Sequence, residues 1–165
     1  MELLHEREAV TILAGETFAT ADIAFLLQMD APKDVHAFNE HLKQHLNGNF
    51  PRFKCRVVRV GTERLLKPVT DEAALATQFQ VLDGEGMSQR EVEQFLATQI
   101  DKGVNHEDPR IKSWLIPSKD DPTKVYLAQV NCHSIIDGIS IMQTYALMQD
   151  NEEDWELNPV PTRDQ

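Results

Sequence analysis

Residues 124–140, KVYLAQVNCHSIIDGIS, carry an apolar strand into a single histidine. Apolar side chains fall on both alternating faces at the start of this stretch, a pattern typical of a strand in the middle of a sheet. The stretch becomes polar at Asn131, and His133 follows where the strand would leave the core. Asp137 and Gly138 suit a tight turn, because glycine adopts backbone angles that other residues resist. The stretch therefore predicts a central strand that ends beside an accessible imidazole.

His133 is a candidate general base by residue type and by position. A histidine side chain can accept a proton near physiological pH, which suits a base at the mouth of a cleft. A lone histidine near a strand end is more often a hydrogen-bonded structural residue, so spacing alone leaves both interpretations open. We do not expect Cys132 to form a thiol–imidazole pair with it, because neighbours on an extended strand point to opposite faces.

The rest of the chain has the patterns of both strands and helices. The predicted strands are residues 22–29, a hairpin within 50–69 that turns at Gly61-Thr62, and residues 77–83, 111–116 and 125–132; the predicted helices are residues 31–48, 88–101 and 139–148. We expect the strand at 22–29 to be buried, Asp34 to cap the first helix, and Ser88 with Glu91 to form a capping box. Strands that alternate irregularly with helices and include a hairpin predict an α/β fold of the mixed α+β kind, with a mixed β-sheet packed with helices.

Length and composition predict one globular domain. The 165 residues are 41% apolar and 26% charged, and no apolar run approaches the roughly 18 residues of a membrane span. We expect no transmembrane segment, and no secretory signal in the mixed-charge start MELLHEREAV. Two cysteines, Cys55 and Cys132, make no disulfide framework. These features favour a cytoplasmic protein, with an organelle interior as the alternative.

The charge pattern bears on the partners. A net charge of -11 argues against nucleic acid, because phosphate binding needs a basic surface. Six of the sixteen basic residues nevertheless lie within residues 50–67. Arg52, Lys54 and Arg56 are therefore candidate anion contacts, although an exposed strand with a charged outer face is the preferred explanation of the pattern.

The stretch CHSIIDGIS, residues 132–140, resembles the His-His-x-x-x-Asp-Gly motif of the chloramphenicol-acetyltransferase-like acyltransferases. That superfamily includes wax ester synthase/diacylglycerol acyltransferases, plant alcohol acyltransferases and peptide-synthetase condensation domains. The match is nearest to the wax ester synthase branch, whose motif commonly continues as Ser-x-x-Asp-Gly-x-Ser. FPRFKCRVV, residues 50–58, is similar to a Pro-Arg-Phe-Arg-x-x-Val stretch of that branch. The order of helix, loop and strand before the histidine also matches, so the resemblance covers most of the chain.

The resemblance implies an O-acyltransferase that moves an acyl group from acyl-CoA to an alcohol, with His133 as the general base. No cofactor or metal is implied, and acyl-CoA is a co-substrate. Asp137 would hold the loop through an ion pair, and Gly138 would let the backbone turn beside the substrate channel. Cys132 and Ser134 complete the supporting set, and the basic residues of 50–58 become candidate CoA contacts.

Two departures from the family pattern qualify this interpretation. The first histidine of the motif is Cys132 here, and Pro109-Arg110-Ile111-Lys112 stands where the family has Pro-Leu-Trp-Glu.

The family's members also have two similar halves with the active site in a tunnel between them. Residues 1–150 correspond to an N-terminal half-domain, followed by an acidic, Pro-containing tail or linker at 151–165. We therefore expect the C-terminal half, a partner chain or a second copy to complete the site. A non-catalytic interaction or scaffold subunit is the alternative.

His41 and His45 are spaced i and i+4, which can hold a metal on a helix. No third ligand is evident beside them in the sequence. We therefore interpret them as a surface pair and predict no metal site.

Overall fold

The structure is a computed structural model that describes residues 2–3, 22–61, 63–103, 107–133, 135–136, 140–141 and 144–145. The chain divides into two units, Met1–Ile135 and Ile136–Gln165. In the second unit the described residues 140–141 and 144–145 are helical, and the Thr144 hydroxyl donates to the Ser140 carbonyl (2.7 Å). The helix predicted at 139–148 is confirmed at these positions, whereas the tail predicted at 151–165 lies outside the described residues.

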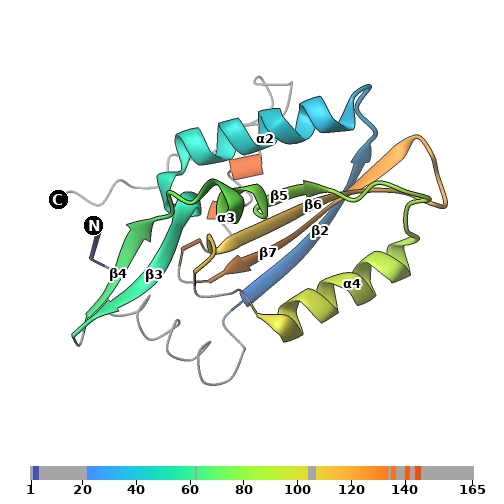
Figure 1. Cartoon of the computed structure of the whole chain (residues 1–165). Helices are drawn as coiled ribbons and strands as arrows, with labels where there is room; N and C mark the ends of the chain where they lie inside the picture. The colour runs from blue at the N-terminus through green and yellow to red at the C-terminus, as the bar shows by residue number, and fades with distance from the viewer. Residues whose placement is uncertain are drawn as a thin grey trace. The chain divides into compact units, whose positions relative to one another are not determined.

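The first unit contains a mixed four-stranded sheet (Figure 1). Its strands, in spatial order, are β2 (Asp22–Asp30), β7 (Lys124–Cys132), β6 (Ile111–Pro117) and β5 (Phe79–Val81). Neighbouring strands run antiparallel except for β5, which is parallel to β6. The mixed sheet packed with helices that the sequence predicts is confirmed.

The central strand of this sheet is β7, as the sequence predicts. It lies between β2 and β6, and its residues from Val125 to Cys132 are buried. The prediction that 22–29 forms a buried strand is wrong in its burial, because β2 is mostly half-buried and pairs only with β7 in the described part of the chain. An apolar run of this length fits an edge strand as well as a central one.

Helix α4 (Gln89–Lys102) covers one face of the sheet. The predicted capping box is confirmed, since the Ser88 side chain accepts from the Glu91 amide and the Glu91 carboxylate accepts from the Ser88 amide (2.8 Å). Val92 and Leu96 of this helix are buried against the sheet. The sheet side of this core consists of Trp114, Ile116, Tyr126, Ala128 and Val130.

Helix α2 (Val35–Asn49) lies on the opposite face, as Figure 1 shows. Asp34 caps it as predicted, because its carboxylate accepts from the Ala37 amide (2.9 Å). Leu42 and Leu46 point inward and are fully buried. Both faces of the sheet are therefore covered by helices, which leaves its ends as the places where a polar side chain can emerge.

A second, three-stranded sheet is formed by β1 (Glu2–Leu3), β4 (Glu63–Pro68) and β3 (Cys55–Val60), in that spatial order. The β3–β4 hairpin turns where the sequence predicts, with Gly61 at φ 63 in the left-handed region that favours glycine. Residues Pro51–Lys54 form a 3-10 helix, η1, so the start of the predicted hairpin is not a strand. A short helix that we did not predict, α3 (Glu72–Ala76), follows β4.

Among the described residues, no helix is both long and apolar enough to span a bilayer.

Candidate functional site

His133 is the first exposed residue at the end of the buried central strand. Cys132, the last residue of β7, is 4% exposed, and the next side chain along the chain is open to solvent. The Ile135 amide donates to the Cys132 carbonyl (3.0 Å), so the chain turns immediately after the strand. The exit of an accessible imidazole from the core is thus as predicted. Ser134, Asp137 and Gly138 lie outside the described residues, and their roles stay predictions.

Three polar side chains, those of Asp22, Cys132 and Arg110, form a row across the end of the sheet next to His133. The β2–β7 register pairs Asp22 with Cys132, and the Cys132 amide donates to the Arg110 carbonyl (2.9 Å). Directly opposite residues of antiparallel strands project to the same face of a sheet. The carboxylate, the thiol and the guanidinium are therefore neighbours on the α4 side, at the end of the sheet from which His133 projects.

Asp22 has a perturbed carboxyl group in this row. Burial raises the pKa of the Asp22 carboxyl above its usual value, while the positive charge of Arg110 and a hydrogen bond from the Cys132 thiol lower it. The raised pKa means that burial outweighs these two favourable contacts. The Asp22 carboxyl, beside the Arg110 guanidinium and the Cys132 thiol, can fix the end of β7, and with it the backbone that carries His133.

Asp22→Asn is expected to gain stability relative to the parent protein as the pH rises. A carboxyl with a raised pKa in the folded state favours folding below its unfolded-state value of 3.8, and that contribution is lost as the pH rises through the folded-state pKa. The uncharged amide does not suffer this loss. Urea unfolding of both proteins between about pH 3 and pH 7 measures the difference.

The control for this prediction is Asp120→Asn, which removes one carboxylate at an exposed position between β6 and β7. If the stability of Asp22→Asn relative to the parent falls as the pH rises, pairing with Arg110 outweighs burial and the prediction is wrong.

The sequence did not single out Asp22 or Arg110 as site residues. The one available signal was a charged residue at the start of each apolar pattern, Asp22 for the one that became β2 and Arg110 for the one that became β6. Such residues are common at strand ends, so only the register of the three strands brings them together.

The α2 side of the same strand end is also polar. Gln129 and Asn131 are buried, and the Gln129 amide nitrogen donates to the Asn131 side-chain oxygen (2.6 Å). The Asn131 amide nitrogen and the hydroxyl of Ser113 on β6 are buried with no hydrogen-bond partner among the described residues. Gln129, Asn131 and Ser113 therefore make the α2 face of this end of the sheet polar as well.

The basic residues predicted as anion contacts occupy two elements. Arg52 and Lys54 lie half-buried in η1, and Arg56 lies half-buried in β3. The Arg110 amide donates to the Cys55 carbonyl (3.2 Å), so this basic stretch adjoins the row behind His133. Arg56 forms an ion pair with Glu107, which offsets its charge. Contact with an anion stays a prediction for all three side chains.

The two histidines with metal-ligand spacing lie on α2. The rings of His41 and His45 have centroids 6.3 Å apart, and the Asn49 amide nitrogen lies 3.3 Å from a His45 ring nitrogen. Within the part of the chain that the structure describes, no third His, Cys, Asp or Glu joins them to form a ligand set. His41 is exposed and His45 is half-buried on this helix.

Comparison with known proteins identifies the fold. No protein-family model and none of the curated proteins matches this sequence. Among solved structures, the wax ester synthase/diacylglycerol acyltransferase from Marinobacter aquaeolei VT8 is similar over 100% of this chain and 43% of its own, with TM-score 0.70 and 20% identity. The starter condensation domain of the rhizomide synthetase RzmA matches over 87% of this chain and 35% of its own, with TM-score 0.68 and 12% identity. The tallysomycin biosynthesis protein TlmII matches over 80% and 31%, with TM-score 0.62 and 18% identity.

These similarities define the class of fold. The chain has the fold of acyltransferase and condensation domains, so the chloramphenicol-acetyltransferase-like fold predicted from the residues around His133 is confirmed. The chain spans between 31% and 43% of the length of these three solved structures. It therefore corresponds to part of each of them, as expected for a half-domain.

Proposed function

We propose that this chain is the acyltransferase-like half of an O-acyltransferase that transfers an acyl group from acyl-CoA to an alcohol. One observation carries the proposal: His133 is the exposed residue at the end of a buried central strand, in a fold shared with a wax ester synthase. A base at such a strand end is held by a rigid scaffold while its ring stays accessible to substrate.

In the proposed reaction, a ring nitrogen of His133 removes the proton from the alcohol as its oxygen attacks the thioester carbonyl. The tetrahedral intermediate collapses, the carbon–sulfur bond breaks, and the departing CoA thiolate receives the proton from the imidazolium. The products are an ester and free CoA. Neither a metal nor a further cofactor takes part.

The supporting residues have separate roles in this proposal. Asp137 and Gly138 shape the turn after the histidine, and Ser134 belongs to the same turn. Cys132 stands in the place of the motif's first histidine, and its thiol donates a hydrogen bond to the Asp22 carboxyl.

Arg52, Lys54 and Arg56 are proposed to contact the phosphates of CoA. Their position beside the row of Asp22, Cys132 and Arg110 supports this role.

A second structural part completes the site in this proposal. His133 is open to solvent in this unit, and a base in open water lacks the positioning and the dry surroundings that supply much of the rate. The short span relative to the solved structures supports a C-terminal half, a partner chain or a second copy as the opposing wall. With acyl-CoA as donor, we infer a cytoplasmic reaction.

Acyl transfer by the purified chain tests the proposal. The chain alone, and the chain with any protein that co-purifies with it, is incubated with palmitoyl-CoA and hexadecanol. Free CoA thiol is measured together with the ester by mass spectrometry. We expect ester from the completed assembly and much less from the chain alone. If no preparation forms ester, the catalytic proposal is wrong.

A non-catalytic interaction subunit is the second candidate. The replacement of the motif's first histidine by Cys132 favours it. It predicts self-association or a stable partner, measured by light scattering and by affinity purification. A chain that stays monomeric and retains no partner contradicts this candidate.

A further inference from the structure

A cavity of about 400 Å³ opens on the α4 side of the four-stranded sheet, within the first unit. It lies between the C-terminal half of α4 and the strands β5, β6 and β7. Its β7 residue is Val130, three positions before His133, or about 10 Å along an extended strand. The volume is within the range of small-molecule sites, which is roughly 300–1,000 Å³.

One wall of this cavity is apolar and partly aromatic. Leu82, Phe95, Trp114 and Val130 line it. The rings of Phe95 and Trp114 pack edge to face, with centroids 5.1 Å apart and planes at 90°. Edge-to-face packing holds both rings in fixed orientations. This wall therefore offers rigid surface against which a flat apolar group can pack.

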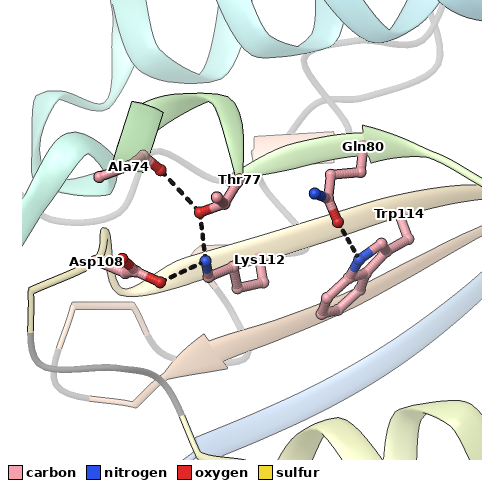
Figure 2. Close-up of polar contacts among 6 residues, drawn as sticks. All are labelled: Ala74, Thr77, Gln80, Asp108, Lys112 and Trp114. Carbon is pink, nitrogen blue, oxygen red and sulfur yellow. Dashed lines mark hydrogen bonds and ion pairs between the residues drawn. The ribbon is translucent and has the colours of Figure 1, made fainter. Parts of the chain in front are cut away.

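Gln80 supplies a hydrogen-bond donor at the edge of this wall. The Trp114 indole nitrogen donates to the Gln80 side-chain oxygen (2.9 Å), as Figure 2 shows. An indole N–H can only donate, so the amide must present its oxygen to Trp114. The Gln80 amide nitrogen then points away from the indole, toward the side on which Lys112 lies. It has no hydrogen-bond partner among the described residues, and it is available to an acceptor.

Lys112 supplies a second donor. Its ammonium group donates to the Thr77 hydroxyl (2.5 Å) and to the Asp108 carboxylate (2.8 Å), and the Thr77 hydroxyl donates onward to the Ala74 carbonyl (2.8 Å; Figure 2). The direction of every bond is fixed, because Thr77 uses its proton on Ala74 and must accept from the lysine. An ammonium group has three donors, so one remains for a ligand.

The charges around the cavity favour an anionic ligand. The charged lining residues are Lys102, Lys112 and Asp108, two positive charges against one negative. This local excess of one positive charge is notable in a chain of net charge -11. A ligand with a single negative charge would neutralise the site, whereas a cation would meet like charge.

We propose that this cavity binds a small planar carboxylate. Its carboxylate accepts from the Lys112 ammonium and the Gln80 amide nitrogen, and its flat body packs against Leu82, Phe95 and Trp114. The site uses none of the residues assigned to acyl transfer. The inference therefore stands apart from the proposed function, and it can be tested without measuring catalysis.

Calorimetric titration of the full chain with 2-naphthoate tests the inference. We expect saturable binding at one site, and binding about tenfold or more weaker for the neutral 2-naphthamide, since hydrogen bonds to charged groups are stronger. In NMR spectra, 2-naphthoate is expected to shift the indole N–H signal of Trp114, which Trp114→Phe identifies. Equal binding of acid and amide, or no saturation, overturns the proposal.

Two variants separate a loss of binding from a loss of folding. Lys112→Met combined with Asp108→Asn removes the ammonium without leaving its carboxylate partner unpaired, and Gln80→Met removes the exposed amide. Each is expected to weaken 2-naphthoate binding by about tenfold. Lys119→Met is the matched control, because Lys119 pairs with Glu91 at the opposite end of α4 (4.0 Å). Unchanged affinity in both folded variants overturns the proposal, as does an equal loss in Lys119→Met.

Discussion

His133→Ala is expected to lower the rate constant of acyl transfer by about 10²–10⁴-fold in the completed assembly, which is the usual contribution of a positioned general base. Alanine cannot accept the proton of the alcohol, so the attack on the thioester proceeds without a general base. Initial rates of CoA release at saturating acyl-CoA measure the effect. Because His133 is exposed, we expect the variant to unfold at the same urea concentration as the parent.

Two controls decide whether His133 acts as a base or as a structural residue. His41→Ala removes an exposed imidazole on α2 and should leave the rate unchanged. Added imidazole should restore part of the activity of His133→Ala, since the free base can occupy the vacated space. If activity survives the substitution, the assignment of His133 as the general base fails. If unfolding shifts along with activity, a structural role explains the loss.

Leu115→Ala is expected to lower the free energy of unfolding by about 2–5 kcal/mol. Leu115 lies in β6, is 0% exposed, and stands opposite Leu127 of the central strand. Truncation removes apolar contacts and leaves a cavity that the surrounding strands cannot close. For a chain of this size the loss corresponds to a decrease in Tm of about 4–20 °C. Urea and thermal unfolding measure the change.

Val60→Ala provides the matched comparison for Leu115→Ala. Val60 ends β3 and is 52% exposed, so its truncation should change stability by less than about 0.5 kcal/mol. Similar effects of the two substitutions would contradict the placement of Leu115 in the core. That placement matters to the site, because β6 also carries Lys112 and follows directly after Arg110.

Local patterns predicted the elements of the fold well where one segment contains the whole signal. The capping box at Ser88 and Glu91, the Asp34 cap and the turn at Gly61 each depend on a few consecutive residues, and all are present. Two errors came from signals that depend on neighbours. The run 22–29 is equally apolar in a central or an edge strand, and Pro51 begins a 3-10 turn whose sequence also fits the start of a strand.

The candidate site was predicted only in part for the same reason. The change from apolar to polar side chains along β7 is enough to predict that His133 lies at the exit of the core. Asp22 and Arg110 could not be found in this way, because they lie 110 and 22 residues from Cys132 in the sequence. Only the pairing of β2, β7 and the start of β6 brings the three side chains together.

By itself, the sequence determined that this chain has a central strand ending at an accessible histidine, within a mixed sheet covered by two capped helices. Those features depend on hydrophobic periodicity and on helix caps, and each of these signals is contained within a single segment of the sequence. The tertiary structure alone decided the row of Asp22, Cys132 and Arg110, and the donors that Lys112 and Gln80 present to the cavity. Both depend on strand register, and a shift of one residue in any one of these strands would turn that strand's side chains to the opposite face of the sheet.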